Sequence, residues 1–93
     1  MAKQDQHYQS LAQTCKILGD ATRLRILHVL GGGESNVSCL CDQLNLPQPT
    51  VSHHLGILKM GGLVSNRRKG KCIFYTVQST NGQTGKAIKL LLK

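Results

Sequence analysis

Apolar residues recur every three or four positions through residue 60, which is the period of an amphipathic helix. We therefore expect four helices, covering residues 8–18, 21–30, 38–44 and 48–60. Gly19 ends the first helix, and Asp20 suits the N-cap of the second because a carboxylate can accept hydrogen bonds from first-turn N–H groups. Ser38 is expected to cap the third helix in the same way. Glycine runs end the second and fourth helices.

Farther along the chain the period changes to two, the alternation of a β-strand. Residues 63–68 and 72–77 are predicted to form two strands, joined as a hairpin by Lys69-Gly70-Lys71. Asn81-Gly82 predicts a turn, and residues 84–92 predict a last helix. The expected fold is mainly α with a small β-hairpin, in the order α-α-α-α-β-β-α. Two short helices joined by a tight turn and followed by a basic hairpin are typical of a winged helix-turn-helix.

Length and composition narrow the class of protein. The 93 residues suffice for a single domain over residues 1–93. Twelve Lys and Arg against four Asp and Glu give a formal charge of +8, which favours a polyanionic partner. Because 40% of the residues are hydrophobic, the chain is not a disordered basic tail. No apolar run reaches the roughly 18 residues of a membrane span, and the polar N-terminus does not resemble a secretory signal. We expect a cytoplasmic protein with no membrane partner and with reduced cysteines.

Two classes of function are disfavoured by the rarer residue types. Tyr8, Phe74 and Tyr75 are the only aromatic residues, too few for the platforms on which single-stranded nucleic acids stack. Four acidic residues and four histidines supply neither a nucleophile–base pair nor paired carboxylates, so we do not expect an enzyme. A helix that binds in the major groove of double-stranded DNA needs neither feature.

The fourth predicted helix carries the candidate DNA-reading face. When Val51, Leu55 and Leu58 face the core, the opposite side presents small or hydrogen-bonding residues. Glutamine can bind adenine through two hydrogen bonds, and hydroxyl groups can contact bases or phosphates. His53 points outward, whereas His54 lies beside the apolar stripe and is expected to be half-buried with a local hydrogen bond. A solvated helix face without a ligand would show the same pattern. The candidate DNA-binding residues here are Gln48, Pro49, Thr50, Ser52, His53 and His54.

A dense run of cations marks the predicted hairpin. The candidate DNA-binding residues here are Arg67, Arg68, Lys69 and Lys71. Cations at the tip of a hairpin suit phosphate contacts or insertion into a minor groove. A solvated charge run that keeps the protein soluble is the alternative, but the density of charge at a turn favours DNA contact.

Four motifs occur together in the order of a known family. They are Leu18–Leu27, Gln48–Leu55, Gly62-Leu63-Val64, and Gly70-Lys71 with Tyr75. Over about residues 8 to 78 the chain resembles the ArsR-type (arsenic-repressor-like, ArsR/SmtB) winged-helix regulators. The resemblance implies a homodimeric transcriptional repressor that binds an inverted-repeat operator. It also implies that the first and last helices form the dimer interface and that an inducer loosens DNA binding. A constitutive winged-helix module that binds DNA or RNA without an effector is the open alternative.

The resemblance also implies where metal ligands would lie, and this chain departs from it. One family site uses His, Asp and Glu on the final helices, but no histidine follows His54 and no acidic residue follows Asp42. Another uses a Cys-x-Cys that falls on Asn36 and Ser38 when counted without gaps from the fourth helix. Cys39-Leu40-Cys41 is therefore out of register with that site.

Cys39 and Cys41 are nevertheless candidate effector-binding thiols. Residues two apart in a regular helix point about 200° apart, so they hold one ion together only if the first turn distorts. The same turn favours a thiolate, which reacts with arsenite, soft metal ions, persulfide or oxidants. The alternative is that Cys41 is a small core residue and Cys39 an inert surface thiol. We expect Cys15 in the core, a structural His28 and no disulfides; Cys72 has no assigned partner.

Overall fold

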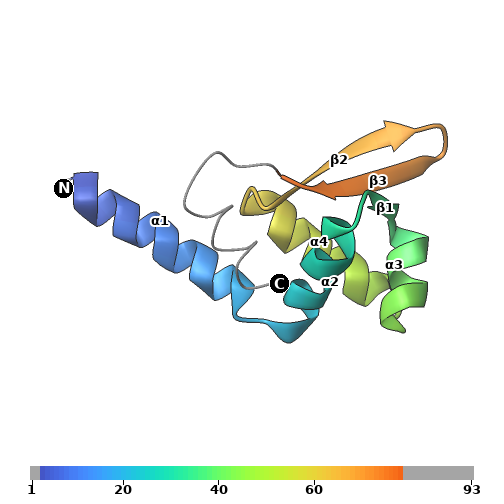
Figure 1. The fold of residues 1–93 in the computed structure, drawn as a ribbon, viewed down its shortest axis with the longest axis horizontal. Helices are drawn as coiled ribbons and strands as arrows, with labels where there is room; N and C mark the ends of the chain where they lie inside the picture. The colour runs from blue at the N-terminus through green and yellow to red at the C-terminus, as the bar shows by residue number, and fades with distance from the viewer. Residues whose placement is uncertain (1–2, 79–93) are drawn as a thin grey trace.

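Four helices and a small antiparallel sheet make up residues 3–78, the part of the chain that this computed structural model describes (Figure 1). The elements are α1 (Lys3–Leu18), α2 (Ala21–Gly31), β1 (Ser35–Asn36), α3 (Val37–Leu44), α4 (Gln48–Met60), β2 (Val64–Lys69) and β3 (Cys72–Val77). This order confirms the predicted mainly helical class with a β-hairpin. The predicted turn at Asn81-Gly82 and the helix over residues 84–92 lie outside the described residues. Between residues 3 and 78, no helix combines the length and apolar character needed to cross a membrane.

Side-chain caps set two of the helix boundaries. Asp20 caps α2 as predicted, and its carboxylate accepts a 3.1 Å hydrogen bond from the backbone N–H of Arg23. The predicted cap at Ser38 is wrong. Asn36 caps α3 instead, because its side-chain oxygen accepts a 2.8 Å hydrogen bond from the backbone N–H of Cys39. α3 therefore begins at Val37, and Ser38 lies within its first turn.

The sheet has the order β1-β3-β2, with both neighbouring pairs antiparallel. Lys69 pairs with Cys72, so the hairpin connection is the two residues Gly70-Lys71 rather than the predicted three. Gly70 has a φ of 65°, a left-handed conformation that glycine adopts without steric cost in such turns. The sequence pattern missed β1 because two residues are too few to show alternation. β1 joins the start of α3 to the hairpin through β3.

The hydrophobic core lies between α2, α3, α4 and the sheet. Val51, Leu55 and Leu58 of α4 are fully buried in it, which confirms the predicted inner face of this helix. The other buried hydrophobic residues are Ile17, Ile26, Leu27, Leu30, Leu40, Leu44, Leu63 and Val64. This core fixes the orientation of α4 relative to the hairpin.

α1 and α2 differ from the prediction at three points. α1 begins at Lys3 rather than at residue 8, because its polar first turns contain good helix formers that apolar spacing does not detect. α1 runs away from the body of the molecule, and among its described residues Ile17 alone is buried (Figure 1). Cys15, predicted in the core, is consequently exposed in the single chain. His28, predicted to be structural, is exposed at an open hollow between α2 and α3.

Candidate nucleic-acid interface

The outer face of α4 presents the predicted polar residues. Gln48, Pro49 and His53 are exposed, and Thr50 and Ser52 are half-exposed. The side-chain amide of Gln48 donates a 2.9 Å hydrogen bond to the hydroxyl of Ser52, one turn along the helix. This contact pre-orients both groups on the surface and leaves the amide oxygen and the second amide proton of Gln48 for a ligand.

Two further properties of α4 suit close approach to a duplex. Pro47 at its N-cap makes no side-chain hydrogen bond, and Pro49 in the first turn has no N–H. Gly56 is exposed, and a Cβ built on it would meet nothing within 4 Å. α4 therefore has the positive end of its helix dipole at Gln48, and a surface without a side chain at Gly56.

His54 differs from its neighbour His53. It is half-buried as predicted, but its hydrogen-bond partner is remote in sequence rather than local: the Nε of Arg23 donates to Nδ1 of His54 at 3.2 Å. The predicted DNA contact by His54 stays a prediction, and Nδ1, being an acceptor here, is already engaged with α2. His54 thus holds α4 in place from the inner side.

Arg23 was missed by sequence reasoning, and it joins three helices. Its Nη1 donates to the backbone carbonyl of Ile17 at the end of α1, at 3.1 Å, while its Nε binds His54 of α4. Its backbone N–H lies in the α2 cap, and this hydrogen bond is the largest cause that lowers the pKa of Asp20. A cation beside the apolar stripe of α2 was the available signal, but the sequence does not show which groups it reaches.

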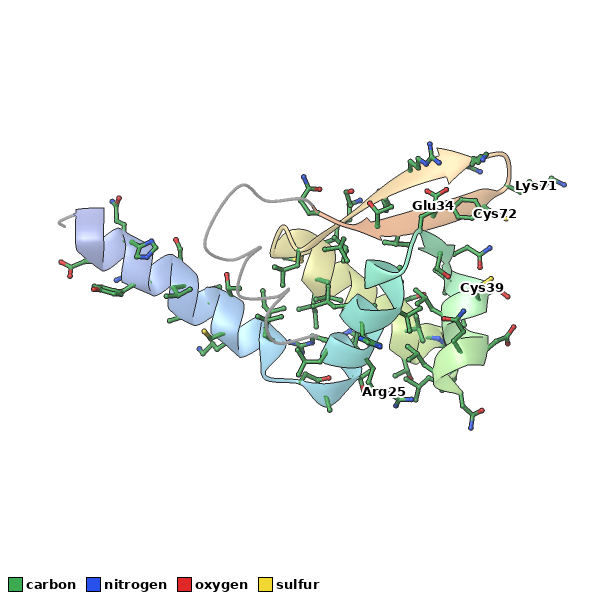
Figure 2. All side chains as sticks on the ribbon, viewed as in Figure 1. Arg25, Glu34, Cys39, Lys71 and Cys72 are labelled. Atoms are coloured by element: carbon green, nitrogen blue, oxygen red, sulfur yellow. The ribbon has the colours of Figure 1, made fainter. Side chains whose placement is uncertain are left out.

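The four cations of the hairpin have different surroundings. Lys69 and Lys71 are exposed, and their amines make no hydrogen bond or ion pair with any residue between 3 and 78. Lys71 extends from the turn away from the body (Figure 2). The Nε of Arg68 donates to the carbonyl of Gly70 at 3.3 Å, which stiffens the turn.

Arg67 forms a two-pronged ion pair with Glu34, which precedes β1. Its Nη2 lies 2.9 Å from Oε1 and its Nε lies 3.1 Å from Oε2. The pair lowers the pKa of Glu34, chiefly through the side-chain hydrogen bond, and raises the pKa of Arg67 for the same reason. The sequence showed the density of cations here but not the carboxylate that binds one of them.

The comparison with known proteins agrees with this geometry. Residues 20–66, just over half of the chain, match the family described as bacterial regulatory protein, arsR family. The chain belongs to the ArsR family. It is therefore a winged helix-turn-helix, DNA-binding transcriptional regulator of a repressor family, and not an enzyme.

Three similar proteins illustrate this ArsR-family membership. An uncharacterized HTH-type transcriptional regulator of Methanocaldococcus jannaschii is 45% identical over 73 residues, 75% of this chain and 80% of that protein. The arsenical resistance operon repressor of Escherichia coli is 44% identical over 64 residues, 68% of this chain and 55% of that protein. The solution structure of a homodimeric winged helix-turn-helix DNA-binding domain from Mycobacterium bovis has a TM-score of 0.85 at 27% identity and covers 98% of this chain and 82% of that one.

The candidate thiols of this ArsR-family chain lie on different sides of α3. Cys39 is exposed, whereas Cys41 is half-buried and packs against the core (Figure 2 labels Cys39). Between residues 3 and 78 no three His, Cys, Asp or Glu side chains are grouped closely enough to hold a metal ion. Cys72, at the start of β3, is exposed. Within residues 3–78, neither candidate thiol therefore belongs to a group of three or more possible metal ligands.

Proposed function

We propose that this chain is a homodimeric repressor that binds an inverted repeat in double-stranded DNA through α4 and the hairpin. The observation that carries the proposal is the two-sided character of α4. Val51, Leu55 and Leu58 are fully buried, whereas the opposite side presents Gln48 and His53. A helix of this kind beside a basic hairpin can lie in a major groove while the hairpin contacts the flanking backbone.

The proposed DNA surface has a reading part and a charged part. The reading part on α4 comprises Gln48, Pro49, Thr50, Ser52 and His53. The charged part on the hairpin comprises Arg68, Lys69 and Lys71, with Arg67 beside them. Phosphate contacts supply affinity for any duplex, and base contacts supply discrimination between sequences.

Dimerisation is supported by the surface of α1. In the single chain this helix leaves Tyr8 64% exposed and Leu11 half-exposed, although both could be covered by a second copy. The similar M. bovis domain is described as homodimeric. A two-fold axis would place two α4 helices about 34–36 Å apart, which matches one turn of DNA. We propose accordingly that residues 1–93 form one DNA-binding domain with dimerisation helices at its ends.

A thiol-directed effector is the finer part of the proposal. Cys39 lies exposed in the first turn of α3, where the helix dipole stabilises a thiolate. Arsenite, a soft metal ion or an oxidant are the classes that would react there, and the similar E. coli protein is named an arsenical resistance operon repressor. A regulator without an effector is the second candidate, favoured by the half-buried position of Cys41.

The salt dependence of DNA binding tests the hairpin contact. Lys71→Ala should reduce the slope of log affinity against log salt by about 0.9 for each lost phosphate contact, or about 1.8 in a dimer. Lys59→Ala is the matched control. It removes an exposed cation from the last turn of α4, away from the proposed DNA-reading residues, and should leave the slope unchanged. Fluorescence anisotropy on a labelled duplex measures both. An unchanged slope in Lys71→Ala would remove the hairpin tip from the interface.

Base reading and the effector need separate arms of the same assay. Gln48→Ala should cost about 1–3 kcal/mol on the cognate site and little on random DNA. Equal losses on both would mean that Gln48 positions the helix without reading bases. Arsenite added to reduced protein should release the DNA, and Cys39→Ser or Cys41→Ser should abolish the release. Binding that arsenite leaves unchanged would exclude arsenite as the inducer and keep the repressor.

A further inference from the structure

Arg67 is the one cation of the hairpin that an acidic side chain already binds, among the residues the structure describes. Glu34 lies 33 positions earlier, between α2 and β1, and Figure 2 shows it beside the hairpin. Both oxygens of the carboxylate accept from the guanidinium, at 2.9 and 3.1 Å. This fork-shaped geometry is the one with which arginine also binds a phosphate group.

The sheet register places the pair on the outer face of the hairpin. Arg67 is paired with Phe74 of β3, and paired residues of an antiparallel sheet share a face. The opposite face carries Val64 and Val77, which are paired with each other and pack against the core. The ion pair therefore spans β3 on the solvent side, where the side chain of Arg67 is 63% exposed.

The carboxylate changes what an approaching DNA backbone meets. Without Glu34, the outer face of the hairpin would present a guanidinium with free donors. With Glu34 in place, the same position presents a neutral pair, and a phosphate must displace the carboxylate or accept its repulsion. The exposed amines of Lys69 and Lys71 form no ion pair with an acidic side chain among residues 3–78, although the charge of Lys69 is close enough to Glu34 to help lower the pKa of that carboxyl.

We propose that Glu34 is a specificity-determining residue that restrains non-specific DNA binding by keeping Arg67 paired. The proposal rests on the proposed function, in which the hairpin contacts the DNA backbone. Lys69 and Lys71 bind phosphates of any duplex. On the cognate site, where α4 is fully docked in the major groove, a phosphate reaches the guanidinium of Arg67. Arg67 then exchanges the carboxylate of Glu34 for that phosphate. Glu34 thereby widens the ratio between cognate and non-cognate affinity without touching a base.

Glu34→Gln tests this directly, because it removes the charge and keeps the shape. On non-cognate duplex the variant should bind more tightly than wild type, with a salt slope steeper by about 0.9 per subunit. When the salt concentration is lowered from about 200 to about 50 mM, this difference in slope should raise the ratio of variant to wild-type affinity by about 3.5-fold per subunit, or about 12-fold in a dimer. The gain on cognate duplex should be smaller, so the specificity ratio falls.

Two further variants assign the gain to Arg67. Glu34→Gln combined with Arg67→Ala should return the salt slope of non-cognate binding to the wild-type value, because no free guanidinium is then left on the hairpin. Asp5→Asn is the charge-matched control, because it removes one exposed carboxylate from α1, far from the hairpin (Figure 1). Urea unfolding of each variant reports whether the fold is retained.

The possible outcomes separate this inference from the proposed function. A steeper slope that depends on Arg67 supports the masking role of Glu34. An unchanged slope, a loss of affinity, or a gain equal to that of Asp5→Asn overturns it and leaves the ion pair a tether of the hairpin. If wild type shows no binding to any duplex, the proposed function is overturned, and this inference with it.

Discussion

Arg23→Met should destabilise the fold and weaken the attachment of α4 to α2. In the structure, Arg23 donates at 3.2 Å to Nδ1 of His54 in α4 and at 3.1 Å to the carbonyl of Ile17 in α1. Methionine retains an aliphatic stem but donates neither hydrogen bond. The substitution therefore removes the side-chain hydrogen bonds by which Arg23 joins α2 to α4 and to α1.

The expected cost follows from the two hydrogen bonds. A hydrogen bond from a charged group contributes about 1.5–3 kcal/mol when buried, and both contacts here are partly exposed, so about 1 kcal/mol each is appropriate. The total of about 2 kcal/mol is a large share of the roughly 5–14 kcal/mol expected for a domain of this size. It corresponds to a fall in melting temperature of roughly 8–16 °C.

Urea unfolding followed by circular dichroism measures this cost, at one fixed protein concentration because a dimer is stabilised by mass action. Arg25→Met is the matched control: Arg25 is exposed and makes a single hydrogen bond, 3.2 Å to the carbonyl of Leu44. Arg25→Met should lower the free energy of unfolding by about 1 kcal/mol or less. A double-mutant cycle with His54→Ala should return a coupling energy of about 1 kcal/mol.

The same variant should affect DNA binding unequally. Because α4 is held less rigidly, the variant should bind the cognate site more weakly than wild type does. Its affinity for non-cognate DNA should stay nearly constant, since the phosphate contacts of the hairpin are unchanged. If Arg23→Met is no more destabilising than Arg25→Met, or if the cycle shows no coupling, the role assigned to Arg23 is refuted.

Three further substitutions test other features of the structure. Gly56→Ala should stabilise the fold by roughly 0.5–1 kcal/mol, since the site is open and helical, yet weaken DNA binding if the duplex approaches that face; unchanged DNA affinity would contradict close approach. Asp20→Ala should cost about 1 kcal/mol at neutral pH. Because the Asp20 pKa is lowered from 3.8 in the folded state, the stabilisation by this cap is full above pH 3.8 and is lost as the pH falls through the lowered pKa. The difference between the unfolding free energies of wild type and variant should therefore shrink as the solution is acidified below pH 3.8. Gly61→Ala should cost about 1–3 kcal/mol, because the added Cβ would overlap the side chain of Ile17 at the contact between α1 and α4; an unchanged unfolding midpoint would show that Ile17 moves away freely.

The sequence predicted α4 and its two faces correctly because both depend on local periodicity. The cap of α3 was misplaced for a non-local reason: Asn36 and Ser38 are equally good caps in isolation, but the pairing of β1 with β3 fixes Asn36 in the extended conformation that a cap requires. Cys15 shows a related limit. Helical spacing places Cys15 on the side of α1 that carries Leu11. It does not show whether another part of the same chain covers that side.

The site was predicted less completely than the fold, because its contacts join distant parts of the chain. A run of cations indicates an electrostatic surface, yet the partner of Arg67 is 33 residues earlier, at a loop that only the folded sheet brings near. His54 was expected to bind locally, whereas its donor, Arg23, is 31 residues away. Neither pairing has a local signal, since each follows from how α2 and the sheet pack on α4.

Selection of bound duplexes from a randomised DNA pool would show whether this chain is a dimeric repressor that reads DNA through α4. The reduced protein is incubated with the pool at near-physiological salt, and the retained sequences are read after several rounds. We expect enrichment of an inverted repeat whose half-site centres lie about 10–10.5 base pairs, or a multiple of that, apart. Gln48→Ala should weaken the base preference at one or more positions of the enriched motif, whereas Lys71→Ala should leave the base preferences unchanged. A pool with no enriched motif, or with a single unrepeated half-site, would contradict a dimeric repressor that reads DNA through α4.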